Sequence, residues 1–165
     1  MRVSEALALT VKDLTADGLM IRATKFKKDR LVPLHDSTLV ALERYLVARW
    51  KVGSTDPALF ISPAGTGVKY STVIAVFLAL ARAVGLRAAP GQLGPRLHDL
   101  RHTFAVRSLE QCCSDRQSIA RHIAGLSTYL GHAHVSDTYW YLQATPALMR
   151  QIACAGESLH RGEHP

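Results

Sequence analysis

The sequence predicts a mostly helical α+β domain with a small antiparallel sheet of two or three strands. Apolar residues follow the 3.6-residue period of a helix between residues 37 and 50. The apolar run Val73–Ala81 is too short to span a bilayer, so it predicts a buried helix. Leu19–Ala23 and Arg30–Leu34 alternate as strands, and the polar segment Lys25–Asp29 between them predicts a β-hairpin.

The first half of the chain is expected to hold the sheet. Apolar residues at helical spacing predict a helix over residues 3–9, and Asp17-Gly18 is a turn signal before the hairpin. The next expected elements are a helix capped by Asp36 or Ser37 and running to about Trp50, and a short strand at Ala58–Ile61.

Helices dominate the second half. Ser71 begins the apolar helix, which ends near Gly85, a residue suited to a C-cap. Residues 86–96 are rich in Gly, Pro and Ala and are expected to form a surface loop. Three more helices are expected at about 98–112, about 116–130 and 136–144, before Pro146 interrupts or restarts the last one.

The charge balance indicates a polyanionic partner. The 165 residues include 20 Lys and Arg against 13 Asp and Glu, which gives a formal net charge of +7, and the sequence pI is about 9.7. For one domain of this size, DNA or RNA is the first candidate partner, and a merely basic protein is the alternative. The basic residues are spread along the chain, so a disordered basic arm does not account for the charge.

Cysteine and histidine usage predicts a cytoplasmic protein without a metal site. The three cysteines, Cys112, Cys113 and Cys154, form no CxxC pair, and their odd number argues against a disulfide framework and for a reducing compartment. The N-terminus lacks the pattern of a signal peptide, and no membrane association is expected. None of the eight histidines belongs to an HExxH motif.

Four residues form a pattern suited to phosphoryl transfer. His98 and Arg101 are three residues apart, so on a helix they project from one face and could converge on a phosphate. His132 adds a second imidazole, and Tyr141 follows it by nine residues. Fixed cations, a proton carrier and a nucleophile suit phosphoryl transfer to a phenol, and nothing in this set requires a metal.

Four segments, taken together, resemble the tyrosine recombinases, the phage-integrase family of DNA strand-exchange enzymes. Residues 98–105 resemble the family's HxxR box, and residues 130–142 resemble its LGH box with the tyrosine that follows. Residues 2–9 are similar to its first arginine box, R-x-S-E-x-x-x-L, and residues 24–34 resemble its lysine-bearing β-hairpin. The boxes occur in the family's order, and the resemblance covers about residues 2–145.

The resemblance implies DNA cleavage and rejoining through a 3′-phosphotyrosyl intermediate, without metal or cofactor. Among the competing tyrosines Tyr129, Tyr139 and Tyr141, the family's nine-residue offset from the LGH histidine selects Tyr141 as nucleophile. The other implied catalytic residues are Arg2, Arg101 and His132 on the phosphate, Lys25 as general acid with Lys27 and Lys28 as alternatives, and His98 as proton carrier or phosphate contact. Expected DNA contacts are Lys27, Lys28, Arg30 and Arg96.

Several of these residues have plainer interpretations that the sequence leaves open. Arg2 could be a disordered terminal side chain, Lys25 part of a solvated turn, and His132 a C-cap histidine. Glu5 could support an arginine or lie solvated on its helix. Two function classes therefore stay open: an active integrase, and a catalytically silent remnant that binds only DNA or a partner protein. A type IB topoisomerase shares the chemistry but fits the motif spacing less well.

The resemblance also carries expectations about organisation and partners. Family members have an N-terminal helical DNA-clamping domain, so residues 1–165 are expected to be a single catalytic-core domain, truncated at its N-terminus. The expected partner is double-stranded DNA. Apolar surface left by the truncation predicts self-association, with residues 146–165 as a tail that is exchanged or disordered.

Overall fold

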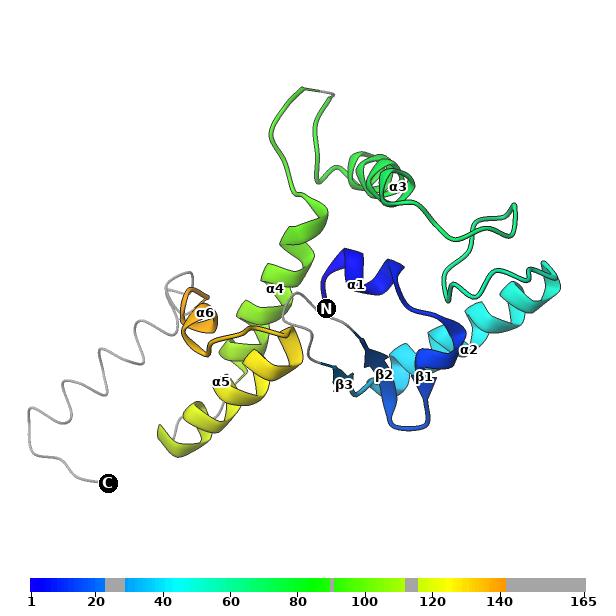
Figure 1. Cartoon of the computed structure of the whole chain (residues 1–165). Coiled ribbons are helices and arrows are strands. Elements are labelled where there is room, and N and C mark those ends of the chain that lie inside the picture. Colours follow the sequence, from blue (N-terminus) through cyan, green and yellow to red (C-terminus); the bar gives the residue numbers. More distant parts are fainter. Residues whose placement is uncertain (23–28, 90, 112–115, 142–165) are drawn as a thin grey trace, which may run out of the picture. The chain divides into compact units, whose positions relative to one another are not determined.

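The computed structural model describes residues 1–22, 29–89, 91–111 and 116–141. They form six α-helices, one short 3-10 helix and three strands (Figure 1). The fold class is therefore the expected one, mostly helical with a small antiparallel sheet. Contacts divide the chain into two compact units, which meet in sequence between His98 and Asp99. Within the described ranges, every helix is too short or too polar to cross a membrane.

A three-stranded antiparallel sheet of order β1-β2-β3 lies in the first unit. The strands are β1 (Leu14–Thr15), β2 (Gly18–Ile21) and β3 (Arg30–Val32). The expected hairpin is confirmed, with Leu19 paired to Val32 and Ile21 to Arg30, although both strands are shorter than expected. Gly18 has φ 135°, and a Cβ there would lie 2.3 Å from the Val32 carbonyl oxygen, so the turn into β2 requires glycine.

Three helices accompany the sheet: α1 (Val3–Leu7), α2 (Asp36–Lys51) and α3 (Tyr70–Ala83). The cap of α2 is His35 rather than Asp36 or Ser37, because the His35 ring accepts a hydrogen bond from the Ser37 backbone N–H. A 3-10 helix, Val11–Asp13, joins α1 to β1. No pattern in the sequence predicts this short helix.

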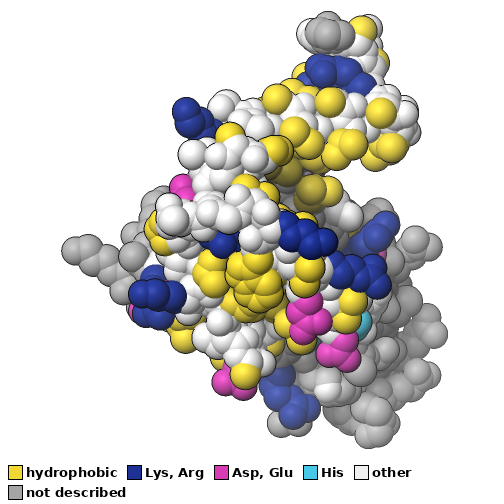
Figure 2. Space-filling view, turned by 90° about the vertical axis from the view of Figure 1, so that its right-hand side faces the viewer, with side chains coloured by type: hydrophobic (Ala, Val, Ile, Leu, Met, Phe, Trp, Pro, Cys, Tyr) yellow, Lys and Arg dark blue, Asp and Glu magenta, His cyan; other side chains and the backbone are white. Residues whose placement is uncertain are grey.

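The helix α3 corrects one expectation. The apolar run Val73–Ala81 is helical as expected, but only its last residue, Ala81, is buried. Val76 and Leu80 are more than half exposed, and they line an open pocket together with Ile61 and Val68 of the preceding segment. Figure 2 shows exposed hydrophobic side chains in its upper part, the region of α3 in Figure 1.

The core of the first unit draws on the hairpin, on α2 and on segments outside both. Arg49 of α2 is also buried, and its guanidinium donates to the Asp56 and Ala58 carbonyls, which ties the segment after α2 to the helix. That segment is not the strand expected at Ala58–Ile61, since it forms only isolated bridges to Thr10 and Gly67. The buried apolar residues are Leu9, Leu19, Ile21, Val32, Leu42, Leu46, Leu59 and Ala81.

Three helices lie in the described part of the second unit. Helix α4 (Leu97–Glu110) enters it from the chain boundary, and α5 (Arg116–Leu130) and α6 (Ser136–Tyr139) follow. The expectation that a helix over 136–144 carries Tyr141 is wrong: α6 ends at Tyr139, and Tyr141 lies in a turn whose N–H donates to the Thr138 carbonyl. One apolar cluster is the core, formed by Ala105, Leu109, Ile123, Leu126, Leu130 and Tyr141.

Candidate active site

The end of α5 positions His132. Gly131 has φ 74°, and its N–H donates to the Thr128 carbonyl while the His132 N–H donates to the Ser127 carbonyl, each at 3.0 Å. These two bonds form a Schellman motif, in which a residue with positive φ reverses the chain at the helix end. The Leu-Gly-His sequence therefore fixes the histidine directly beyond the helix. His132 therefore follows the helix end, as expected for a C-cap histidine, but its ring also contacts α4 and α6.

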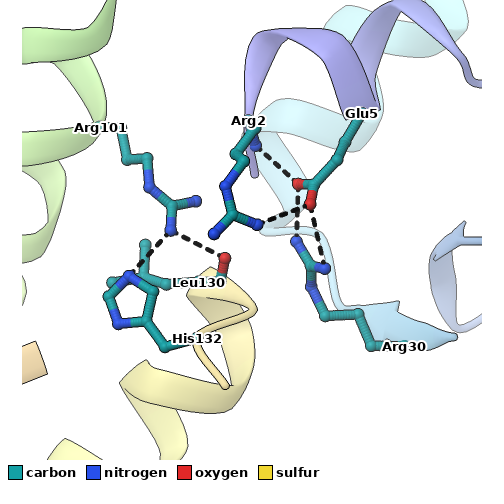
Figure 3. A network of polar contacts seen from close by, with 6 residues as sticks. All are labelled: Arg2, Glu5, Arg30, Arg101, Leu130 and His132. Carbon is teal, nitrogen blue, oxygen red and sulfur yellow. Dashed lines mark hydrogen bonds and ion pairs between the residues drawn. The ribbon is translucent and has the colours of Figure 1, made fainter. Parts of the chain in front are cut away.

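Arg101 joins α4 to this helix end. Its Nη2 donates to the Leu130 carbonyl at 2.9 Å and lies 3.1 Å from His132 Nε2 (Figure 3). The Leu130 carbonyl belongs to the last residue of α5, where helical N–H donors run out, so the guanidinium caps the helix. Arg101 is only 9% exposed, and its two contacts fix the orientation of its planar guanidinium within the unit.

The second nitrogen of the His132 ring contacts α6. Its Nδ1 lies 2.9 Å from the hydroxyl oxygen of Thr138, and Thr138 is 0% exposed. Both ring nitrogens therefore have protein partners, one from α4 and one from α6. The ring is held at two points, which restricts its rotation.

Tyr141 lies against the same ring. Its ring stacks on His132 with a centroid separation of 6.0 Å and an interplanar angle of 8°, and it makes a tilted contact with His102 at 5.0 Å. It is 8% exposed. Of the competing tyrosines, Tyr129 instead stacks on Phe104, and Tyr139 is half exposed. The described part of the second unit thus brings together three of the predicted site residues: Arg101, His132 and Tyr141.

A second polar cluster lies in the first unit around Glu5. This carboxylate accepts from the Arg2 backbone N–H at 2.7 Å and from Arg2 Nη1 at 3.1 Å. From β3, Arg30 Nη2 donates to it at 2.8 Å (Figure 3). Glu5 is the third residue of α1 and bonds back to the N-cap, as in a capping box. Its side chain is 8% exposed, so the first of its two interpretations holds: Glu5 supports arginines.

The electrostatics of this cluster follow from its geometry. Burial alone would raise the pKa of Glu5, but the hydrogen bonds from Arg30 and Arg2 and the positive charge of Arg30 outweigh burial and lower the pKa from 4.5 to about 2. Glu5 is therefore ionised at neutral pH. The Arg30 side chain is 10% exposed and engaged with Glu5, so its expected contact with DNA stays a prediction.

A family model described as the phage integrase family matches residues 1–147. The chain belongs to this family. An integrase/recombinase named y4rB from Sinorhizobium fredii is 43% identical over 156 residues, which cover 92% of this chain and 50% of the relative. Tyrosine recombinase XerA of Pyrococcus horikoshii is 30% identical, and the match covers 92% of this chain and 48% of the relative. The chain spans about half the length of these curated relatives.

Solved recombinase structures share the fold of this phage-integrase chain. XerA recombinase matches with a TM-score of 0.73 and 27% identity, covering 94% of this chain and 53% of the other. XerH site-specific recombinase in a pre-cleavage complex with its difH substrate matches with a TM-score of 0.64 and 27% identity, covering 86% of this chain and 38% of the other. The chain therefore has the fold of a tyrosine-recombinase catalytic domain.

Two further predicted residues of the integrase site, His98 and Arg96, lie in the first unit. His98 and Arg96 are exposed and line a pocket of about 410 Å³ in the first unit, together with Tyr70, Phe77 and Arg87 among others. Lys25, Lys27 and Lys28 lie outside the described residues, so their roles stay predictions. No group of three or more His, Cys, Asp or Glu residues suited to a metal occurs in the described part of the chain.

Two contacts near the phage-integrase motifs had no signal in the sequence. Thr138 belongs to the box between the LGH histidine and the tyrosine, but the sequence assigns its hydroxyl no role, since its contact with His132 depends on the chain reversal at Gly131. Asp13 is buried and accepts from Thr10 and from Arg22 Nε at 2.7 Å, which fixes the end of β2 just before the hairpin segment. Hydrogen bonds from Arg22 and Thr10 lower the pKa of Asp13.

Proposed function

We propose that this chain is the catalytic domain of a site-specific DNA recombinase or integrase that cleaves and rejoins strands through a 3′-phosphotyrosyl intermediate. The observation that carries the proposal is the grouping of Arg101, His132 and Tyr141 in one unit, with the guanidinium on one nitrogen of the imidazole and the phenol stacked on its ring. A buried cation beside an imidazole suits a phosphate with developing negative charge, and a phenol is the nucleophile for it. The solved pre-cleavage structure of XerH, which contains its difH substrate, supports double-stranded DNA as the partner.

The proposed reaction exchanges one phosphodiester for another. The Tyr141 phenol oxygen attacks the scissile phosphorus and loses its proton, with His98 as proton acceptor or phosphate contact. The bond between phosphorus and the 5′-oxygen breaks, and the departing oxygen takes a proton from Lys25. The 3′-phosphate then remains on Tyr141. Attack by the 5′-hydroxyl of another strand reverses these steps and rejoins DNA, so the bond energy is conserved and neither ATP nor metal takes part.

The cluster around Glu5 would supply the other cation. Arg2 is the first arginine of the family motif, and Glu5 holds its side chain through the bond at 3.1 Å. The proposal requires Arg2 and Arg101 to act on the same phosphate in the DNA complex, where two guanidiniums can each hold two non-bridging oxygens. Arg30 then serves as support for Glu5, since it neutralises the carboxylate from its other side.

A suicide DNA substrate tests the proposal. A nick near the cleavage site lets the 5′-hydroxyl fragment diffuse away, so the covalent protein–DNA adduct accumulates. Tyr141→Phe should abolish the adduct while DNA affinity stays nearly unchanged, because phosphate contacts dominate binding. Tyr139→Phe is the matched control and should still form adduct. An adduct that persists in Tyr141→Phe and disappears in Tyr139→Phe would transfer the nucleophile to Tyr139.

One observation favours a second candidate, a catalytically silent module that binds only DNA or a partner protein. Tyr141 is 8% exposed and packs between His132 and His102, so its ring belongs to the core of the second unit as described. A wild-type chain that binds DNA but never accumulates adduct on any suicide substrate would support this alternative over the recombinase.

A further inference from the structure

The protonation state of His132 follows from the donors around it. A guanidinium can only donate hydrogen bonds and does not lose its proton in proteins. His132 Nε2, 3.1 Å from Arg101 Nη2, must therefore be the acceptor of that bond. A neutral imidazole whose Nε2 accepts carries its proton on Nδ1. Nδ1 in turn lies 2.9 Å from the Thr138 hydroxyl oxygen, which must accept.

The contact with DNA proposed above needs the opposite tautomer. To donate to a phosphate oxygen, His132 has to carry a proton on Nε2, and Arg101 has to turn its N–H toward the phosphate. In the neutral ring Nδ1 is then an acceptor and needs a donor. A hydroxyl can fill both roles, since it rotates its hydrogen to accept from Nδ1–H or to donate to Nδ1.

We propose that Thr138 is a positioning residue that holds His132 through Nδ1 in both tautomers. In the DNA-free protein its hydroxyl accepts from Nδ1–H while Nε2 accepts from Arg101. On phosphate binding the ring gives up the Nδ1 proton to solvent and takes one on Nε2 from solvent, so its charge is unchanged. The Thr138 hydroxyl then donates to Nδ1. This inference rests on the proposed function, because it assigns the ring a phosphate to bind.

The surroundings of Thr138 suit this role. The residue is 0% exposed, so water does not compete for the hydroxyl, and its backbone N–H donates to the Val135 carbonyl at 2.8 Å, which anchors it in α6. Tyr141 is joined to the same residue, since its N–H donates to the Thr138 carbonyl at 3.1 Å. Thr138 thus contacts the imidazole through its side chain and the phenol-bearing residue through its backbone.

The first test is spectroscopic and independent of cleavage. In the wild-type chain labelled with ¹⁵N-histidine, His132 should show a protonated Nδ1 and an unprotonated Nε2, and a His132→Asn variant assigns its signals. Thr138→Val keeps the shape but removes the hydroxyl, so Nδ1–H loses its acceptor: the Nδ1 signal should shift and its proton should exchange faster with solvent, while Arg101 keeps Nε2 unprotonated. Thr138→Ser should keep the wild-type spectrum. An Nε2–H tautomer in the wild type, or an unchanged Nδ1 signal in Thr138→Val, would overturn the inference.

The second test measures cleavage on the suicide substrate. Thr138→Val should slow adduct formation by roughly 10- to 100-fold, the range expected when a reacting group is misplaced rather than removed. Thr138→Ser should restore most of the rate, and Thr103→Val, which removes an exposed hydroxyl on α4, should have little effect. Equal rates for Thr138→Val and wild type would contradict the positioning role.

The two tests separate the inference from the function on which it rests. If the wild-type chain forms no adduct but the His132 Nδ1 signal responds to Thr138→Val, the proposed recombinase activity fails while the contact between Thr138 and His132 stands. If adduct forms normally and the Nδ1 signal does not respond, the activity stands and the inference fails.

Discussion

Replacing Glu5 with Gln should destabilise the first unit measurably. The carboxylate joins Arg2 of the α1 N-cap to Arg30 of β3, and both its own side chain and that of Arg30 are about nine-tenths buried. The pKa of Glu5 falls from 4.5 to about 2, a difference of roughly 2.5 units that corresponds to about 3.5 kcal/mol at about 1.4 kcal/mol per unit. Solvent screening near the surface reduces this, so we expect a loss of about 2 kcal/mol in the free energy of unfolding.

Urea unfolding at several pH values checks both the size and the sign of this effect. The folded-state pKa of Glu5 lies below its unfolded-state value, so its stabilisation is complete above pH 4.5 and is lost as the pH falls toward 2. The wild-type chain should therefore lose stability through this window, and Glu5→Gln should lose less because it has no proton to gain there.

Glu43→Gln is the matched control, since Glu43 is an exposed carboxylate on α2. It should change the free energy of unfolding by less than about 0.5 kcal/mol. A Glu5→Gln variant as stable as this control at pH 7, or one with the same loss between pH 4.5 and 2 as the wild type, would refute the electrostatic account of the cluster.

Three further predictions use other parts of the chain. Arg101→Lys should slow adduct formation roughly 100-fold because a point charge cannot replace a bidentate donor, and Lys12→Ala on the exposed surface should leave the rate unchanged. Lys25→Ala should cleave poorly but recover on a substrate with a 5′-bridging phosphorothiolate, whose leaving group needs no proton; failure to recover would assign the general acid to another residue. In urea unfolding, Gly18→Ala should lower the free energy of unfolding by about 1–3 kcal/mol, since the new Cβ would clash with the β3 backbone. Gly125→Ala, in the open interior of α5, should raise it by about 0.5–1 kcal/mol.

Local patterns in the sequence were sufficient for the elements with strong periodicity. The hairpin of β2 and β3, the long helix α2 and the ends of α3 and α5 at Gly85 and Gly131 agree with the expected positions within a few residues. The sequence does not predict strand β1, because two residues cannot show alternation. The helix α3 is less buried than its apolar run predicts, since such a run indicates a helix but does not say which neighbours cover it.

The sequence predicts the motif residues of the candidate site but not the side chains that hold those residues in place. Arg101, His132 and Tyr141 could be selected from spacing within the family motifs, and the structure brings them together. The link from Glu5 to Arg30 spans 25 residues and depends on how β3 lies beside α1, so no local pattern contains it. The contact between Thr138 and His132 depends on a backbone reversal, which the sequence indicates only as a glycine.

The membership of Tyr141 in the core of the second unit has a thermodynamic consequence. If its phenol is to reach a DNA phosphate, the turn after α6 has to open locally, and the observed cleavage rate is scaled by the fraction of molecules in the open state. Low concentrations of urea or moderate warming, which populate this opening before global unfolding, would then increase cleavage over a limited range. A rate that rises and then falls along a denaturant titration would be the signature of a nucleophile that is stored in the hydrophobic core.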